Sequence, residues 1–298
     1  AMYEAKAGAG VGVYEAEDDD YSVRRLELAG ALRRAIDEGE LMVYYQPKAR
    51  LSDGAIIGAE ALVRWQHPEF GMLPPDDFIS IAERSGLIGS LTQFVLRRAI
   101  SECRAWHARG WDLSVAVNLS VVGLIDLDLP EAIDGMLRVA GLDPSYLTLE
   151  ITESSIMNTG RTVAAIDRLA RLGVKLSIDD FGTGYSSLSY LQKLPVHEVK
   201  VDKSFVMSMS NNESDAAIVK SIVDLAHNLE LKVVAEGVED GASWQRLDRM
   251  GCDIAQGYYM SRPIPPDAFV QWIEAWPERR TELFGPQLAS HTAVAVRG

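Results

Sequence analysis

Residues 174–180 read VKLSIDD, a short apolar run that ends in two adjacent aspartates, Asp179 and Asp180. Such a run, bounded by polar residues, is typical of a buried strand. Seven further runs of this kind lie along the chain: LMVYYQP (41–47), AIIGAEALVRW (55–65), LSVAVNLS (113–120), YLTLEI (146–151), VHEVKV (196–201), LKVVAE (231–236) and CDIAQGYY (252–259). The sequence therefore predicts eight strands.

Helical segments separate most of these strands. Apolar residues recur at helical spacing in residues 76–109, 159–172, 214–229 and 242–250. This alternation predicts a mainly parallel sheet with helices outside it. The link around Ser52–Gly54 is too short for a helical crossover, so the first two strands should be antiparallel. The predicted fold is α/β, a modified (β/α)₈ TIM-like barrel with an antiparallel first strand.

Length and composition indicate a globular chain, with 47% hydrophobic and 24% charged residues. The chain has 298 residues, which allows two ordinary domains or one barrel of about 250 residues. No apolar run reaches the roughly 18 residues of a membrane helix, and the first residues lack a signal-peptide pattern, so we expect no membrane contact by this segment. The net charge of −14 argues against binding DNA or RNA through a broad basic surface.

The cysteines and histidines give no sign of a zinc site or of a disulfide framework. Cys103 and Cys252 lie far apart, without a CxxC motif, and are interpreted as reduced structural residues. The five histidines show no HExxH motif or other paired ligand spacing. Any metal is therefore expected to have oxygen ligands.

The two ends of the chain read differently from the middle. Residues 1–20 lack a recognisable domain start and end in an acidic run. Residues 22–39 predict an amphipathic helix, either a linker helix packed on the domain or a signalling connector, and the sequence leaves both readings open. Residues 277–298 show no periodicity after their prolines and are expected to be a flexible tail. The main domain is therefore expected to span residues 21–276.

Polar residues follow nearly every predicted strand. In a (β/α)₈ barrel the catalytic groups come from the carboxyl ends of the strands, which meet at one mouth. A single polar residue there is more often a solvated loop residue or a helix cap. Recurrence from strand to strand favours one shared site. The residues in question are Glu60, Asn118, Glu150, Asp179, Asp180, Lys200, Glu236 and Gln256.

Five carboxylates at one mouth would repel one another unless cations were present. Carboxylate and amide oxygens are ligands that suit Mg²⁺ or Mn²⁺. Asp179 and Asp180 would point to opposite faces of a regular strand, but a twist at the strand end could bring both to the mouth, where one could bridge two metals. Two such ions are the usual device for attack at phosphorus. Lys200 could orient the attacking water, or it could simply form a salt bridge.

The ordered motifs resemble those of the EAL-domain phosphodiesterases of bacteria. They are YQPK (45–48), EALVRW (60–65), HPEFGMLPPDDFISIAE (67–83), NLS (118–120), LEITE (149–153), DDFGTGYSSL (179–188), VKVDKSFV (199–206), VVAEGVE (233–239) and QGYYMSRP (256–263). The resemblance covers roughly residues 24–276. It implies hydrolysis of cyclic di-GMP to linear pGpG on a modified (β/α)₈ barrel with two Mg²⁺ or Mn²⁺ ions.

The resemblance also implies roles, residue by residue. The first metal would take Glu60, Asn118, Glu150 and Asp179, and the second would take Asp179 and Asp180, with Glu236 acting through water. Lys200 would hold the attacking water, so that Lys200, Glu236 and Glu60 form the catalytic set. The substrate pocket would include Gln46, Arg64, Glu239 and Gln256. Glu153 would anchor the DDFG loop close to the interface of a homodimer.

The opening AMYEAKAGAG (1–10) resembles the end of a GGDEF domain, so the chain is expected to be the EAL half of a tandem GGDEF-EAL protein. The substrate implies a cytoplasmic location, with upstream membrane tethering left open. Lys48 and Met260 depart from the residues common in the family. Two rival functions remain: a receptor that binds cyclic di-GMP without cleaving it, and an unrelated Mg²⁺-dependent barrel enzyme that acts on a small carboxylic acid.

Overall fold

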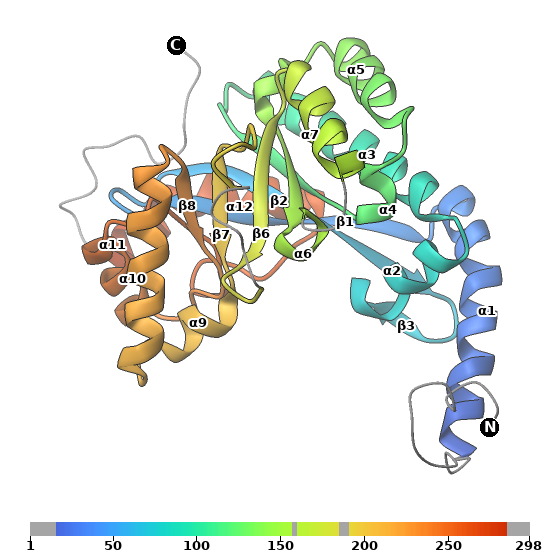
Figure 1. The fold of residues 1–298 in the computed structure, drawn as a ribbon, viewed down its shortest axis with the longest axis horizontal. Helices are drawn as coiled ribbons and strands as arrows, with labels where there is room; N and C mark the ends of the chain where they lie inside the picture. The colour runs from blue at the N-terminus through green and yellow to red at the C-terminus, as the bar shows by residue number, and fades with distance from the viewer. Residues whose placement is uncertain (1–15, 157–159, 185–190, 285–298) are drawn as a thin grey trace.

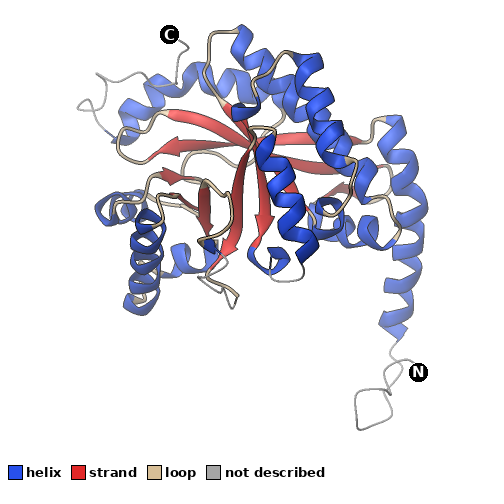
Figure 2. Cartoon of the chain, turned by 45° about the horizontal axis from the view of Figure 1, so that its top comes forward, coloured by secondary structure: helices blue, strands red, loops and turns tan. Residues whose placement is uncertain are grey.

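The computed structural model describes residues 16–156, 160–184 and 191–284, which form a barrel of strands surrounded by helices (Figures 1 and 2). The strands are β1 (Leu41–Arg50), β2 (Ile56–His67), β3 (Gly71–Leu73), β4 (Ser114–Leu119), β5 (Leu147–Thr152), β6 (Lys175–Phe181), β7 (Glu198–Val201), β8 (Lys232–Ala235) and β9 (Ile254–Ala255). All eight predicted strands are present, and β3 is an addition that pairs only with the end of β2 among the described strands.

The barrel closes through its first strand, as the short link between the first two strands predicted. The order around the sheet is β1-β9-β8-β7-β6-β5-β4-β2, and β1 also pairs with β2. Strand β1 is antiparallel to both neighbours, whereas the other neighbours in the ring are parallel. Gly54 makes the tight turn between β1 and β2 with a φ of 68°. The predicted modified (β/α)₈ barrel is confirmed.

The helices lie outside this ring (Figure 2). They are α1 (Ala16–Glu38), α2 (Pro75–Arg84), α3 (Ile88–Ala108), α4 (Val121–Leu124), α5 (Leu129–Ala140), α6 (Glu153–Ile156), α7 (Gly160–Arg171), α9 (Lys203–Ser208), α10 (Glu213–Asn228), α11 (Gly241–Met250) and α12 (Pro266–Phe284). The segment with helical periodicity over residues 76–109 forms α2 and α3, and Gly86 between them has a φ of 72°. No described helix is long and apolar enough to cross a membrane.

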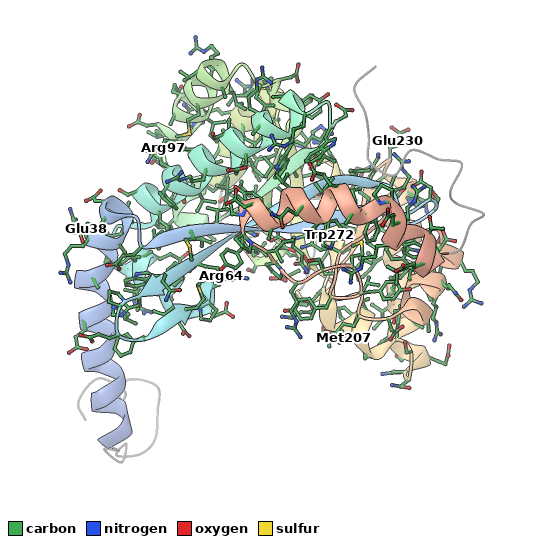
Figure 3. All side chains as sticks on the ribbon, turned by 180° about the vertical axis from the view of Figure 1, so that it is seen from behind. Glu38, Arg64, Arg97, Met207, Glu230 and Trp272 are labelled. Carbon is green, nitrogen blue, oxygen red and sulfur yellow. The ribbon has the colours of Figure 1, made fainter. Side chains whose placement is uncertain are left out.

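The ends of the domain differ from the sequence prediction. Helix α1 begins at Ala16, inside residues 1–20, which were expected to be the remnant of an upstream GGDEF domain and a linker, while residues 1–15 lie outside the described residues. At the other end, the predicted flexible tail was wrong for residues 277–284, because α12 continues through Pro277. Figure 3 shows this helix, which carries Trp272, beside β1.

Aromatic packing explains why α12 continues past its proline. Trp276 is fully buried, and its Nε1 donates to the carbonyl of Gly54 at 2.9 Å. The ring of Phe284 lies 4.6 Å from the ring of Trp244. These contacts offset the backbone hydrogen bond that Pro277 cannot make. Residues 285–298 of the predicted tail lie outside the described part of the chain.

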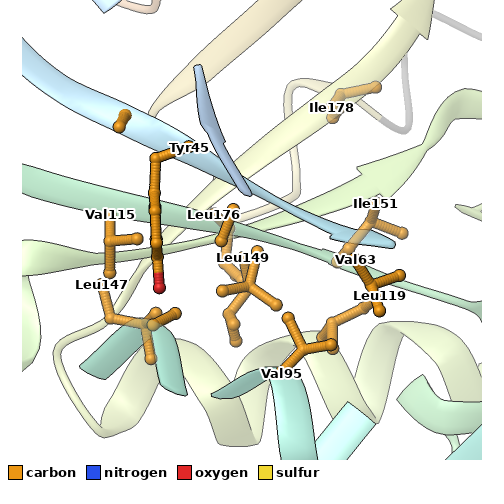
Figure 4. Packing of buried hydrophobic residues seen from close by; sticks show 14 of the residues in the cluster. Tyr45, Val63, Val95, Val115, Leu119, Leu147, Leu149, Ile151, Leu176 and Ile178 are labelled. Atoms are coloured by element: carbon orange, nitrogen blue, oxygen red, sulfur yellow. The ribbon is translucent and has the colours of Figure 1, made fainter. Parts of the chain in front are cut away.

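The main core lies between the strands and the helices. Alternate residues of each strand point outward, so β4, β5 and β6 contribute fully or almost fully buried apolar side chains to this layer, and Figure 4 shows several of them gathered in one cluster. They are Val115, Val117, Leu119, Leu147, Leu149, Ile151, Leu176 and Ile178. The other face of each strand points into the barrel, where the polar residues collect.

Candidate active site

The register of the strands brings the predicted polar residues together at one end of the barrel. Gln46 lies opposite Glu60 in the β1–β2 pair, and Asn118 lies beside Glu150 in the β4–β5 pair. In the next pair along, Asp179 is beside Thr152. Because parallel strands start and end together, residues at equal depth become neighbours around the ring.

Lys200 occupies the centre of this group. Its ammonium lies 2.7 Å from Glu150 Oε2, 2.7 Å from Glu236 Oε1, 3.1 Å from Asp179 Oδ1 and 3.6 Å from Glu60 Oε2. The side chain is fully buried. Lys200 therefore forms salt bridges, and its partners are the predicted metal ligands, while its role in orienting the attacking water stays a prediction.

Glu60 is the meeting point of the amide side chains. Asn118 Nδ2 donates to Glu60 Oε1 at 2.6 Å, and Gln256 Nε2 donates to Glu60 Oε2 at 2.5 Å. Gln256 Nε2 also donates to Gln46 Oε1 at 3.0 Å. Three residues from three separate motifs are thus hydrogen-bonded in one network around a single carboxylate.

Asp179, Asp180 and Glu236 form an acidic cluster, with one oxygen of each residue within 4.8 Å of the others. Asp180 has a φ of 55°, a left-handed conformation that few residues other than glycine adopt. Its backbone N–H donates to Asp179 Oδ1 at 3.0 Å. This turn of the chain brings both aspartates to the same cluster, as the adjacent pair at a strand end suggested.

The surroundings of the ionisable groups at the mouth shift their pKa values in different directions. Burial opposes the charge on Lys200, but the carboxylates, led by Glu150, raise its pKa well above the ordinary value, so Lys200 is cationic. Burial also opposes ionisation of Glu150, yet Lys200 and Lys48 together lower its pKa to about 2. Burial raises the pKa of Glu236 to about 8 and raises that of Glu60, and in Asp180 burial and the adjacent Asp179 act together to raise the pKa.

A cavity of about 810 Å³ opens over these residues. Of the predicted site residues, those that line it are Gln46, Glu60, Asn118, Asp179, Glu236, Glu239 and Gln256. An apolar wall faces them and includes Ile79, Leu91 and Val95. Tyr258 and Lys203 also line the cavity, and the sequence analysis assigned no role to either of them.

Arg64 and Glu153 lie at the edges of the site. Arg64, labelled in Figure 3, comes from β2, with its guanidinium 5.9 Å from the centre of the Tyr44 ring. Glu153 is buried and accepts a hydrogen bond from the backbone N–H of Gly182 at 2.9 Å. Glu153 therefore contacts the start of the DDFG loop, and its role as a loop anchor stays a prediction, while residues 185–188 of that motif lie outside the described residues.

One contact at the centre of the barrel was not predicted from the sequence. Lys48 Nζ lies 2.7 Å from Glu150 Oε1, so both oxygens of Glu150 accept from lysine ammonium groups. Lys48 is two residues from Gln46 on the same strand, so the sequence could indicate that both side chains point to the same face, but not that Glu150 is the partner.

The residues at the mouth suit divalent cations. The donor atoms are carboxylate and amide oxygens, which are hard ligands, and no described cluster combines them with histidine or cysteine. The carboxylates also outnumber the two ammonium groups that reach them, and after burial the repulsion from Asp179 and Glu60 adds to the raised pKa of Glu236. A doubly charged cation would relieve this excess of negative charge.

The family model for the EAL domain matches residues 29–263. The chain belongs to the EAL domain family. The match spans most of the chain, from within α1 to a point just before α12, and so includes every strand of the barrel. The resemblance inferred from the ordered sequence motifs is therefore confirmed.

Relatives of this EAL domain include two proteins of Pseudomonas aeruginosa. It is 40% identical to the bifunctional diguanylate cyclase/cyclic di-GMP phosphodiesterase MucR, over 90% of this chain and 40% of MucR. It is 43% identical to the cyclic di-GMP phosphodiesterase NbdA, over 86% of this chain and 33% of NbdA. The chain therefore spans less than half of either relative.

The fold has also been seen with a ligand in a related protein. The structure of the PaMucR phosphodiesterase in complex with c-di-GMP aligns with this EAL domain at a TM-score of 0.79 and 41% identity. The alignment covers 82% of this chain and 99% of that one. Phosphodiesterases of the family depend on divalent metals, which agrees with the oxygen-rich mouth described above.

Proposed function

We propose that this EAL domain hydrolyses cyclic di-GMP to linear pGpG. The observation that carries the proposal is the position of Lys200, held by four carboxylates beneath an 810 Å³ cavity. The same barrel, at 41% identity, binds c-di-GMP in the PaMucR phosphodiesterase. Each part of the predicted constellation is present in this chain.

The reaction adds water across one phosphodiester bond. The water oxygen bonds to phosphorus, the bond from phosphorus to the 3′ oxygen breaks, and that oxygen takes up a proton. Lys200 would hold the water with its ammonium, which Glu150 and Glu236 orient. Glu236, which contacts Lys200 and lines the cavity, would lie beside the same water.

We further propose that two Mg²⁺ or Mn²⁺ ions are held at the mouth. Glu60, Asn118, Glu150 and Asp179 would hold the first ion, and Asp179 would share the second with Asp180, with Glu236 acting through water. When bound, such a pair lowers the pKa of water and neutralises phosphate oxygens. The cluster of Asp179, Asp180 and Glu236 supports this assignment, since its oxygens already lie within 4.8 Å of one another.

The substrate would lie in the cavity over these groups. Gln46, Gln256 and Glu239 line the cavity and offer amide and carboxylate groups to a nucleotide. Arg64 is close enough to the Tyr44 ring to be oriented by it, and it would meet a phosphate with its guanidinium. Glu153 would keep the DDFG loop next to Asp180 through its bond to Gly182.

We also propose the setting in which the domain works. The parent chain would carry a GGDEF domain upstream, a combination that the bifunctional name of MucR supports. The domain would act in the cytoplasm as a homodimer. Analytical ultracentrifugation of this chain tests the dimer.

The experiment that tests the activity is incubation of the purified chain with cyclic di-GMP and either Mg²⁺ or Mn²⁺, with and without a chelator. We expect metal-dependent appearance of pGpG on chromatography. Binding of cyclic di-GMP by calorimetry without any product would instead support the receptor function. The absence of both binding and product would overturn the proposal.

A further inference from the structure

Lys48 is a second buried lysine beneath the candidate active site. Among the residues that the structure describes, the buried lysines are Lys48 and Lys200, with side chains 7% and 0% exposed. Lys48 Nζ lies 2.7 Å from Glu150 Oε1, and Lys200 Nζ lies 2.7 Å from Glu150 Oε2. The fully buried carboxylate of Glu150 is thus held between two ammonium groups, one on each oxygen.

The contacts of Lys48 extend away from the mouth. Because β1 runs antiparallel to β2, Lys48 lies deeper in the barrel than Gln46, which pairs with Glu60. Its other partner is Glu198, the first residue of β7, at 3.4 Å. The charges therefore alternate along the inside of the barrel, from Glu198 through Lys48, Glu150 and Lys200 to the carboxylates of the mouth.

The geometry makes Glu150 the link between the two lysines. Besides Glu150, Lys200 contacts Asp179 at 3.1 Å and Glu236 at 2.7 Å. An oxygen of a fully buried carboxylate that loses its donor must find another, since leaving it unpaired is costly. With Lys48 absent, the nearest ammonium is that of Lys200. It would move toward Oε1 of Glu150 and away from the mouth.

We propose that Lys48 is a positioning residue, which holds Oε1 of Glu150 and thereby leaves Lys200 directed at Asp179 and Glu236. The proposal rests on the hydrolysis proposed above, in which Lys200 holds the water. Lys48 touches neither substrate nor the reacting atoms. It acts through Glu150, across two ion pairs of equal length.

A displaced Lys200 should slow catalysis, because the rate depends steeply on the position of the group that orients the water. A displacement of about 1 Å of a group that orients a reactant can lower the rate roughly 100-fold. We expect Lys48→Met to lower kcat by about tenfold or more and to leave KM within about twofold, because the cavity walls are unchanged. Lys48→Gln removes the charge but keeps a donor, and we expect a loss in the same direction.

Two controls separate positioning from general stability. Glu198→Gln removes the charge of the other partner of Lys48 and leaves the bond from Lys48 to Glu150 intact, so it should lower kcat less than Lys48→Met does. Lys220→Met removes an exposed lysine of α10 that pairs with Asp224, and kcat should not change. If Lys48 mattered only as a buried ion pair, Glu198→Gln and Lys48→Met would have similar effects.

The direct test is the side-chain ammonium signal of Lys200 in ¹⁵N NMR of the metal-free protein, assigned by its loss in Lys200→Arg. This readout does not depend on activity, so it separates failure of the positioning role from failure of the proposed hydrolysis. We expect Lys48→Met, or Lys48→Gln if the first variant does not fold, to shift the Lys200 signal. Glu198→Gln should shift it less.

Two results would overturn the proposal. One is a Lys200 signal at the same position in the folded Lys48 variants and the wild type. The other is a metal-loaded Lys48 variant with kcat within twofold of the wild type, if the wild type itself turns over. An effect of Glu198→Gln as large as that of Lys48→Met would also count against positioning, because it would show that the ion-pair chain acts as a whole.

Discussion

The two faces of strand β5 show two uses of a buried position. Leu149 and Glu150 are neighbours in sequence and are 0% and 1% exposed. Leu149 points outward into the apolar layer beneath the helices, whereas Glu150 points into the barrel between two lysines. Equal burial therefore accompanies opposite chemistry, and the direction of the side chain decides which applies.

The two faces should contribute differently to stability. Burial of a leucine side chain stabilises a fold by about 2 kcal/mol. A buried ion pair contributes little by comparison, because the cost of removing both charges from water offsets their attraction. The apolar residues on the outer face of the barrel should thus contribute most of the stability, while the charged residues on the inner face should contribute little.

The largest effect that would sharpen this comparison is expected from Glu60→Ala. We expect kcat to fall by about 1,000-fold, the scale of loss when a group acting directly on the transition state is removed. The fold should remain, because the change also removes one of several crowded carboxylates. The thermal unfolding midpoint should stay within about 4 °C of the wild type. Product chromatography and thermal unfolding measure the two quantities.

The matched control is Glu131→Ala, which removes an exposed carboxylate of α5 that pairs with Arg168. Activity of this variant should equal that of the wild type. Near-normal turnover by folded, metal-loaded Glu60→Ala would break the comparison, because the inner face would then not be the site of the chemistry.

Leu149→Ala, on the outer face, is expected to have a smaller effect, which lowers stability and leaves activity nearly unchanged. We expect a loss of about 3 kcal/mol in the free energy of unfolding, from lost burial and the cavity left behind. The folded Leu149→Ala variant should keep kcat within about threefold of the wild type. Urea unfolding measures the loss, and Val139→Ala is the matched control because Val139 is 91% exposed. A large loss of kcat in the folded variant would mean that the outer layer positions the site.

Sequence alone predicted the strands and the polar residues at their ends. Apolar runs that end in polar residues predicted the barrel and its mouth, and the structure then shows the register, which puts Asn118 beside Glu150. The antiparallel first pair followed from a link too short for a helix. These features depend on local patterns, which a single sequence contains.

Features that depend on distant contacts were not predictable in the same way. The pairing of Lys48 with Glu150 joins residues 102 positions apart, and nothing near Lys48 in sequence indicates its partner. The continuation of α12 past Pro277 depends on Trp276 reaching Gly54, 222 positions away. A proline in a helical pattern predicts a stop, and only the tertiary contacts of the aromatic residues explain why there is none.

The smallest effect is expected from Lys220→Met, which tests whether a lysine–carboxylate pair matters wherever it occurs. Lys220 and Asp224 lie four residues apart on α10, with side chains 47% and 58% exposed. Water and salt screen such a pair, so we expect the free energy of unfolding to change by less than about 0.5 kcal/mol. Lysine and methionine have similar helix propensity, which leaves the ion pair as the main difference.

Urea unfolding of Lys220→Met at low salt and at about 1 M salt measures this difference, because salt should remove most of what the pair contributes. A change above about 1 kcal/mol would show that exposed pairs also stabilise this fold. The same pair of charges at Lys200 is expected to control turnover instead, since both side chains are fully buried and little screened. The surroundings of an ion pair, and not its composition, would then determine its role in this barrel.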